Sequence, residues 1–387
     1  MVAVWQDKYQ QTLAQLEALV HDQVVPALSY ALFEGERVWT KEQGWAQLQP
    51  TREALQPGMF YDLASLTKVL ATTPVIAWLV QEGQLRWDDP VQKYLPELKG
   101  QSVTLRELLT HTAAIEGYIP HRERLNQTEL LTALLQTEQF GPNAKRNICY
   151  TDLGLIFAGL IAERVTGVPI QTLATRVLFT PLGLASELTF RPQPNETVPT
   201  AITAHRGLLR GEVHDPKAAV LKEHCGSAGL FGTLTGVLTY VQALITTNLN
   251  GLLTPASVAM MFSDQTALPG EHHRAMGWKL FTSRGTPRHL IASHTGFTGT
   301  FLLIDQQTKQ GLIGLTNRVH PTGHNQAYLA PRDQFFATYL NEKAGQEKKS
   351  ARLAPPYQEG SQQGGHFCAE LKLIRVVIKL LIELRRH

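Results

Sequence analysis

Predicted strands near both ends of the chain enclose a long helical middle, and this order constrains the fold most strongly. Apolar runs bounded by turn residues predict strands over residues 27–34 and 37–45, joined by a turn at Gly35-Glu36. Four further strands are predicted towards the C-terminal end, over residues 275–282, 289–293, 300–305 and 311–317. A sheet must bury its apolar face against another layer, so the two sets of strands are expected to form one sheet.

The segment between these two sets of strands is predicted to be mainly helical. One helix is expected over residues 69–87, continuing from a turn at Ser65, and another over 153–166, which Gly167 would close at its C-terminal end. Other helices are predicted over residues 1–23, 105–110, 128–137 and 326–340. The expected fold is α/β of the α+β type, with an antiparallel sheet built from both chain ends, flanking helices and an inserted, mainly helical lobe.

The predicted organisation is one large domain followed by a distinct tail. The domain covers residues 1–345, with a sheet lobe from about 1–60 and 250–345 and a helical lobe from about 65–250. Clefts between lobes are common places for binding sites, so we expect the site between these two lobes.

The tail, residues 346–387, has a different composition. Proline and glycine residues over 351–365 predict a linker, and residues 370–384 predict an apolar helix with a narrow polar stripe. Such an amphipathic helix could contact a membrane surface peripherally or bind a partner, and packing against its own domain is equally consistent with the pattern.

Composition excludes several classes of function. The 387 residues are 43% hydrophobic and 18% charged, with a net charge of +3, so there is no electrostatic case for binding nucleic acid. The three cysteines are widely spaced and predict neither a zinc site nor a disulfide framework. Residues 1–23 lack the pattern of a secretory signal, and no apolar run is long enough to span a bilayer. A cytoplasmic protein is therefore expected.

The chemistry is indicated first by Ser65 and Lys68, which are three residues apart at the start of a predicted helix. Residues at this spacing share one helix face, so the lysine amino group can reach the serine hydroxyl. A serine hydroxyl becomes a useful nucleophile only when a neighbouring base accepts its proton. At a helix N-terminus, the serine N–H is also available to bind an oxyanion.

Two later segments make the functional interpretation of this pair more specific: Tyr150-Thr151-Asp152 and His294-Thr295-Gly296. Their order resembles the three-motif signature of serine β-lactamases and penicillin-binding proteins, Ser-x-x-Lys, Tyr-x-Asn or Ser-x-Asn, and Lys-Thr-Gly. The spacing is similar to the branch with a tyrosine in the second motif, which contains class C β-lactamases, D-amino-acid peptidases and related esterases. The resemblance also includes residues 104–112, 227–233 and 315–321. It extends to about residue 340 and implies the β-lactamase/transpeptidase-like fold.

The resemblance implies roles for individual residues. Ser65 would be the nucleophile of an acyl-enzyme, Lys68 and Tyr150 would be the candidate bases, and the Phe297 N–H would be the second oxyanion donor. Lysine and tyrosine side chains have ordinary pKa values of about 10.4 and 10, so either base must be perturbed to act at pH 7. The sequence leaves open which of the two accepts the first proton. Neither a metal ion nor an organic cofactor is expected.

Asp152 stands where the family more often has asparagine. A carboxylate near Lys68 would favour its ammonium form and raise its pKa, which moves the role of base towards Tyr150. The same carboxylate also disfavours a tyrosinate. Alternatively, Asp152 could be the N-cap of the helix that begins at Leu153, and the two interpretations are compatible.

His294 replaces the usual lysine of the third motif. A histidine with an ordinary pKa is mostly neutral at pH 7, so its attraction for substrate carboxylates should be weaker. The chain is therefore expected to be a serine hydrolase for small ester, amide or peptide-like substrates, most consistent with a carboxyl esterase or amidase. The alternatives are a D-alanyl-D-alanine carboxypeptidase or weak β-lactamase, with Arg318 as a carboxylate anchor, and a non-catalytic binding protein of the same fold.

Overall fold

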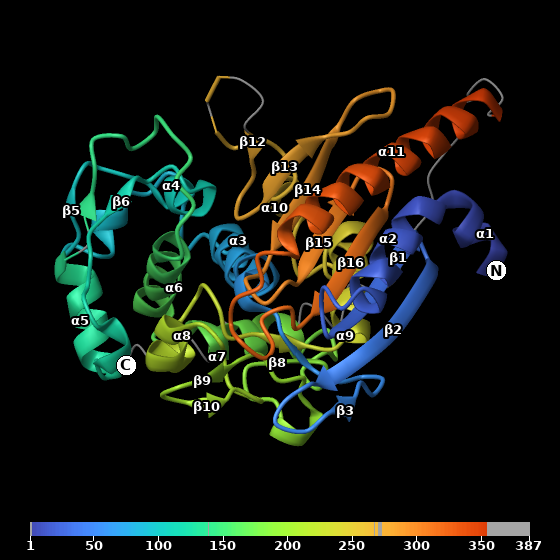
Figure 1. Ribbon diagram of the computed structural model, residues 1–387. Coiled ribbons are helices and arrows are strands. Elements are labelled where there is room, and N and C mark those ends of the chain that lie inside the picture. The colour runs from blue at the N-terminus through green and yellow to red at the C-terminus, as the bar shows by residue number, and fades with distance from the viewer. Residues whose placement is uncertain (1, 138, 267, 270–272, 354–387) are drawn as a thin grey trace.

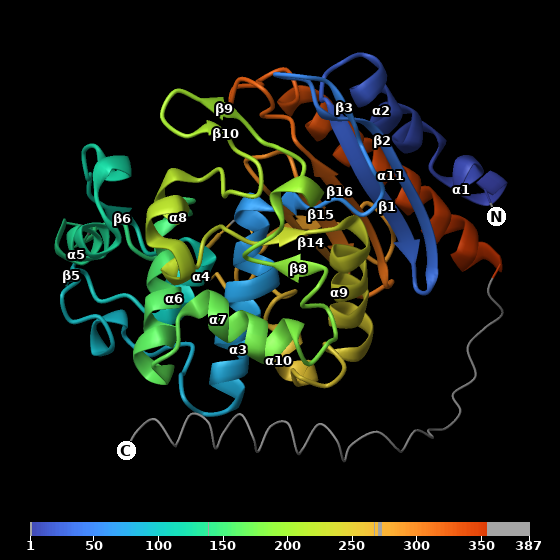
Figure 2. The same cartoon turned by 90° about the horizontal axis from the view of Figure 1, so that it is seen from below.

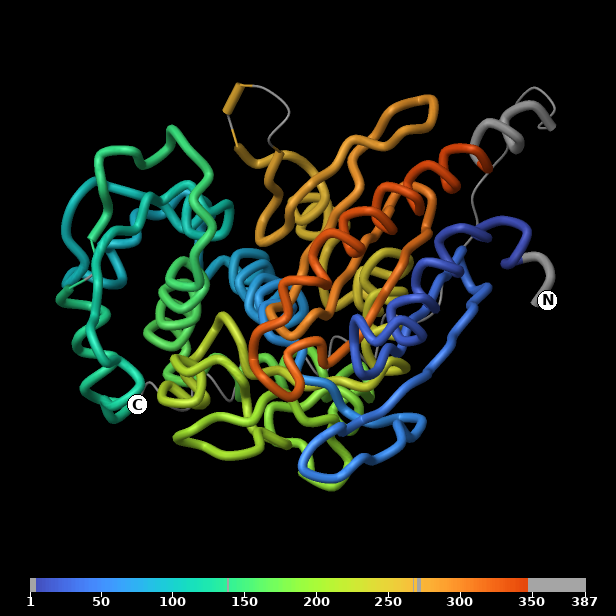
Figure 3. The backbone as a smooth tube through the Cα atoms, in the orientation of Figure 1, coloured from blue at the N-terminus to red at the C-terminus, as the bar shows by residue number. Residues whose placement is uncertain are grey.

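An eight-stranded antiparallel sheet forms the centre of the protein, as the computed structural model shows (Figure 1). The structure describes residues 2–137, 139–266, 268–269 and 273–353. The strand order is β12-β13-β14-β15-β16-β1-β2-β3. The bounds are β1 Ala27–Glu34, β2 Arg37–Gln47, β3 Glu53–Ala54, β12 His273–Arg274, β13 Lys279–Thr282, β14 Leu290–Thr295, β15 Phe301–Asp305 and β16 Gln310–Thr316. Strands from both chain ends therefore meet in one sheet, where β1 pairs with β16 (Figure 3).

The central strand β1 is buried along its whole length because both faces of the sheet are covered. Alternate side chains of a strand point to opposite faces. Tyr30 and Leu32 face a layer of three helices, α1 Val2–Lys8, α2 Gln10–His21 and α11 Leu329–Leu353, whereas Ala31 and Phe33 face the rest of the protein. Figure 2 shows α2 and α11 on one side of the sheet and α9 on the other.

The opposite face of the sheet packs against α9 and the helical lobe (Figure 2). The α-helices on this side are α3 Thr73–Gln81, α4 Leu105–Thr110, α5 Gln127–Thr137, α6 Leu153–Thr166, α7 Ile170–Ala174, α8 Pro216–Leu221, α9 Leu234–Thr247 and α10 Pro255–Ala259. Small sheets are formed by β4 Tyr61–Asp62, β11 Phe231–Gly232 and β8 Leu188–Thr189, by β5 Lys99–Gly100, β7 Gln139–Phe140 and β6 Ile115–Glu116, and by β9 Ile202–Thr203 with β10 Gly207–Leu208. The predicted fold class, with an antiparallel sheet, flanking helices and a helical insertion, is confirmed.

Several predicted elements differ from the observed ones at their ends. The N-terminal helix is interrupted at Tyr9, whose buried hydroxyl donates a hydrogen bond to Glu34 at 3.0 Å. The helix predicted to reach residue 87 ends at Gln81, because Gly83 adopts a left-handed conformation with φ of 73°. In the other direction, α11 continues to Leu353, beyond residue 340 and into the segment predicted as linker.

The amphipathic helix predicted over residues 370–384 lies outside the described residues. Within the described part of the chain, no single helix is both long and apolar enough to cross a membrane. One bent pair, Leu153–Thr166 followed by Ile170–Phe179 at 75°, has the required length and composition only when taken together.

Candidate active site

Ser65 lies in a tight turn between the small strand β4 and the helical segment that leads into α3. A 3₁₀ turn, Ala64–Leu66, is followed by one turn of π-helix, Lys68–Thr72. Ala64 has a positive φ of 46°, a conformation that costs a residue other than glycine about 1–3 kcal/mol. The buried Asp62 carboxylate stabilises the turn by accepting hydrogen bonds from the N–H groups of Ala64 at 2.8 Å and His214 at 2.7 Å. Burial raises the pKa of Asp62 to about 6.

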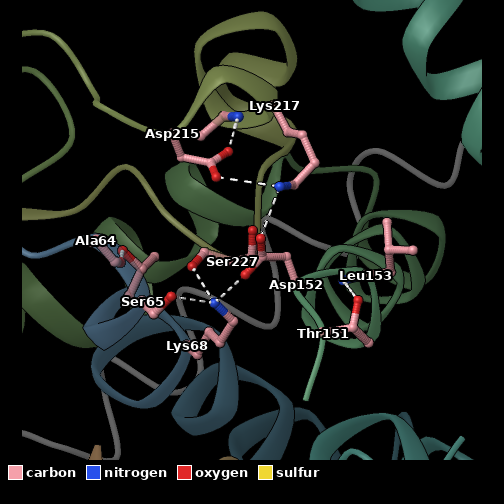
Figure 4. Close-up of polar contacts among 12 residues, drawn as sticks. Ala64, Ser65, Lys68, Thr151, Asp152, Leu153, Asp215, Lys217 and Ser227 are labelled. Carbon is pink, nitrogen blue, oxygen red and sulfur yellow. Dashed lines mark hydrogen bonds and ion pairs between the residues drawn. The ribbon is translucent and has the colours of Figure 1, made fainter. Parts of the chain in front are cut away.

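Lys68 is fully buried directly beneath Ser65. Its Nζ donates to Ser65 Oγ at 2.7 Å, to Asp152 Oδ1 at 2.8 Å and to the Ser227 carbonyl oxygen at 3.1 Å (Figure 4). These three acceptors match the three donors of an ammonium group. Burial by itself lowers the pKa of Lys68, but the Asp152 carboxylate beside it outweighs burial and raises this pKa above the ordinary value.

Asp152 occupies the N-cap position of α6, as one interpretation of the sequence expected, but its carboxylate does not cap the helix. Its side chain makes no capping hydrogen bond, and the N–H of Leu153 instead donates to Thr151 Oγ1 at 3.3 Å. The Asp152 carboxylate points to two lysines: Oδ1 accepts from Lys68 at 2.8 Å, and Oδ2 lies 2.9 Å from Lys217 Nζ (Figure 4). Burial tends to raise the pKa of Asp152, but the two ammonium groups lower it well below its usual range.

The Tyr150 ring lies between two histidines at the mouth of the site and is 46% exposed. Its centroid is 4.6 Å from that of His111 and 6.1 Å from that of His294. Lys68 Nζ is 5.3 Å from the centre of the same ring, which places the phenol beside the serine–lysine pair. The two candidate bases therefore lie together.

Both histidines that flank Tyr150 are buried and uncharged. Burial, together with the cations Lys68 and Arg274, lowers the pKa values of His111 and His294 well below the ordinary value. Neither ring nitrogen of His294 has a hydrogen-bond partner within the described residues. His294 thus supplies no positive charge at the position where the resembling family has lysine.

The end of β14 approaches the Ser65 turn closely, and Gly296 makes this contact possible. A Cβ atom at Gly296 would lie 2.2 Å from Thr300 Oγ1 and 2.8 Å from the Leu63 carbonyl oxygen. The Gly296 N–H donates to the Thr300 carbonyl oxygen at 2.7 Å, which closes the turn that contains Phe297. In the part of the chain that the structure describes, the Phe297 N–H donates to no protein acceptor and remains available to a ligand.

These residues surround one cavity of about 630 Å³. Of the residues predicted for the site, the cavity is lined by Ser65, Tyr150, Asp152, His294, Thr295, Gly296 and Phe297. Lys68 lies beneath it and is reached through Ser65. The structure therefore brings together every residue predicted for the site from the sequence.

The cavity also contains cationic residues that were not predicted as site residues. Lys217 in α8 contacts Asp152, and Arg274 in β12 and Lys279 in β13 line the wall next to β14. Asp215 and Pro216 give a recognisable helix start, with the Asp215 carboxylate accepting from the Ala218 N–H at 2.8 Å, and so place Lys217 in the first turn of a helix. Only the fold shows that this turn faces Asp152.

Comparisons with known proteins agree with this fold. Residues 12–334 match the Beta-lactamase family. A protein of Escherichia coli K12 named "Putative D-alanyl-D-alanine carboxypeptidase" is 27% identical over 315 residues, 68% of this chain and 70% of that protein. A protein of Bacillus subtilis 168 named N-acetylmuramyl-L-alanine amidase is 26% identical over 328 residues, 73% of each chain.

Solved structures show the same architecture. A class C β-lactamase mutant superimposes with a TM-score of 0.69 at 19% identity, covering 86% of this chain and 97% of that chain. EstCE1, a hydrolase with promiscuous acyltransferase activity, superimposes with a TM-score of 0.67 at 20% identity, covering 86% and 99%. From the family match over residues 12–334 and these relatives, we conclude that the chain belongs to the Beta-lactamase family of serine hydrolases.

Proposed function

We propose that the chain forms an acyl-enzyme on Ser65 and hydrolyses carboxylic esters or amides of small molecules. The observation that carries this proposal is the 2.7 Å contact between Lys68 Nζ and Ser65 Oγ at the floor of a cavity of about 630 Å³. A serine beside a buried amine, with the Phe297 N–H available nearby among the described residues, is the arrangement that nucleophilic catalysis needs. A non-catalytic binding protein would not require a buried lysine whose amino group donates a hydrogen bond to a serine hydroxyl.

The proposed reaction has two acyl-transfer steps. Ser65 Oγ attacks the carbonyl carbon of the substrate while its proton passes to Lys68 or Tyr150, and the N–H groups of Ser65 and Phe297 bind the oxyanion. The leaving alcohol or amine takes a proton as its bond to the carbonyl carbon breaks. Water then attacks the carbonyl carbon of the acyl-enzyme while a base accepts its proton. The ester bond to Ser65 Oγ breaks, the carboxylic acid leaves, and Ser65 Oγ takes up that proton.

The environment of His294 supports neutral substrates. Because His294 is buried and uncharged, this position offers no cation for a carboxylate. Two relatives are named as an amidase and a carboxypeptidase, and one structural neighbour as a hydrolase.

Assaying short p-nitrophenyl esters, a chromogenic cephalosporin and a D-alanyl-D-alanine peptide side by side would test the proposal. A wild-type protein that hydrolyses the cephalosporin better than the esters would contradict the esterase assignment.

Introducing a permanent charge at position 294 should change the substrate preference. In His294→Lys, the ratio of kcat/KM for a carboxylate-bearing β-lactam to that for a neutral ester should rise about fivefold, which corresponds to about 1 kcal/mol for a partly screened charge pair. The ratio cancels general losses of activity that affect both substrates. An unchanged ratio would show that position 294 does not contribute to substrate selection.

A second candidate function is a carboxypeptidase for peptides that end in a free carboxylate. The carboxylates that line the cavity, Asp152, Asp215 and Asp333, are each paired with a lysine or arginine. Among the described residues, the half-buried Arg274 and the buried Arg318 have no carboxylate partner. An unpaired, partly desolvated cation in a cavity favours an anionic ligand group.

Arg274 provides the test of this second function. Arg274→Met should lower kcat/KM for the D-alanyl-D-alanine peptide about tenfold relative to that for a neutral ester, because a hydrogen bond to a charged group is lost. Arg288→Met is the matched control, since Arg288 is exposed and lies outside the cavity. Equal losses for both substrates would assign Arg274 to the support of Tyr150, whose ring centre lies 5.9 Å from its guanidinium carbon.

A further inference from the structure

We propose that Lys217 is a positioning residue that holds Asp152 from the side opposite Lys68 and limits how strongly this carboxylate retains the proton on Lys68. The inference rests on the proposed function, since it concerns proton transfer from Ser65. It adds a third ionic group to the chain of contacts through Ser65, Lys68 and Asp152, from a helix that the three sequence motifs do not include.

The contacts form a continuous chain across the floor of the cavity. Lys217 Nζ is 2.9 Å from Asp152 Oδ2, and Asp152 Oδ1 is 2.8 Å from Lys68 Nζ, which donates to Ser65 Oγ at 2.7 Å (Figure 4). The Lys217 side chain is only 10% exposed. Asp215 holds it from the other side, with its Oδ2 at 3.3 Å from Nζ. Lys217 is therefore fixed between two carboxylates and cannot be a mobile surface lysine.

The charges explain why such a group is needed. An amide at position 152 would accept a hydrogen bond from Lys68 without adding charge, whereas the Asp152 carboxylate adds a full negative charge beside it. Lys217 neutralises that charge through the second carboxylate oxygen. With Lys217 removed, Asp152 would bind the Lys68 ammonium more strongly and oppose its deprotonation.

Other charged and titratable groups face this cluster and set the background. On the Lys68 side are Tyr150 and the uncharged His111 and His294, and Arg274 lies beyond the Tyr150 ring. On the other side, Asp215 contacts Lys217, and the positive charge of Arg122 weakly disfavours the charged form of Lys217. A more negative field at Asp152 disfavours proton loss from Lys68 and from Tyr150 alike. The expected direction is therefore the same whichever base accepts the first proton.

The test is the pH dependence of ester kcat/KM, whose acid limb reports the essential base of the free enzyme. In Lys217→Met, this limb should move to higher pH by about one unit, so that kcat/KM on the acid side falls about tenfold and recovers at high pH. In Asp152→Asn, the limb should move to lower pH. In the Asp152→Asn background, adding Lys217→Met should shift the limb by less than about a third of a unit, because no carboxylate remains to be neutralised.

Two controls and one replacement variant separate a specific effect from a structural one. Lys217→Arg keeps the charge and should keep the wild-type limb. Lys222 is an exposed lysine that directly follows the same helix and does not line the cavity. Lys222→Met should therefore also leave the pH profile of kcat/KM unchanged. If Lys217→Met lacks a cooperative thermal transition, Lys217→Gln replaces it, with an upward shift still expected because the charge is lost.

The outcomes distinguish failure of this inference from failure of the proposed function. Fluorophosphonate labelling of the same preparations reports whether Ser65 is a nucleophile at all. A wild type that labels on Ser65, with an unmoved limb in folded Lys217→Met or Lys217→Gln, overturns the role of Lys217 alone. Equal shifts in the wild-type and Asp152→Asn backgrounds also overturn it, because Lys217 would then act without Asp152. A wild type that neither labels nor hydrolyses the esters contradicts the proposed function itself.

Discussion

Replacing Ser65 with alanine should abolish covalent labelling by a fluorophosphonate and lower ester turnover by about three to six orders of magnitude. The hydroxyl is the only group in the proposed mechanism that forms a bond to the substrate, so no other residue can substitute for it. The change removes one hydrogen-bond acceptor from Lys68, which keeps Asp152 and the Ser227 carbonyl oxygen. The fold should therefore survive, and the midpoint of thermal unfolding checks this.

Ser263→Ala is the matched control for this experiment. Ser263 is exposed, bonds to the Ala259 carbonyl oxygen of α10 and does not line the cavity. This variant should label and turn over ester as the wild type does. Near-normal turnover in a folded Ser65→Ala protein would contradict acyl-enzyme chemistry on this residue.

The sheet could be predicted from the sequence because its signals are local. The strand at Ala27–Glu34 and the turn at Gly35 show in a few adjacent residues, and the observed β1 has the predicted bounds. The same is true of α6, whose end at Thr166 follows from Gly167 in a left-handed conformation with φ of 69°. The spacing of apolar residues and the glycines that end each element are enough to predict the bounds of such elements without knowledge of the rest of the fold.

Other features could not be predicted because they depend on contacts between distant segments. The π-helical turn at Lys68–Thr72 is buried on all sides, so its apolar pattern does not reveal the departure from α-helical geometry. The position of Asp152 before α6 suggested a cap, but Lys217 and Lys68 attract the carboxylate away from the helix end. His111, whose ring is tilted against that of Tyr150 at a centroid distance of 4.6 Å, lies in a segment that resembles the family without revealing this contact.

Lys68 and Tyr150 are expected to act as one proton-transfer unit, and the second large effect follows from this. Lys68→Ala and Tyr150→Phe should each lower the rate of acylation by about three orders of magnitude or more. The double variant should be little slower than either single variant, because each change already breaks the same proton path. Single-turnover acylation kinetics on all three variants measure this, and additive losses would show that the two residues act separately.

The structure makes this cycle practicable in a folded protein. When Lys68 is removed, Asp152 keeps its 2.9 Å contact with Lys217, so the buried carboxylate is not left without a partner. Tyr118→Phe and Lys99→Ala are matched controls at exposed positions outside the cavity and should acylate normally. A Tyr150→Phe variant that acylates as fast as the wild type, with Lys68→Ala inactive, would make Lys68 the sole base. It would also require Lys68 to lose its proton despite its contact with Asp152, so the acid limb of the wild-type profile should then lie at high pH.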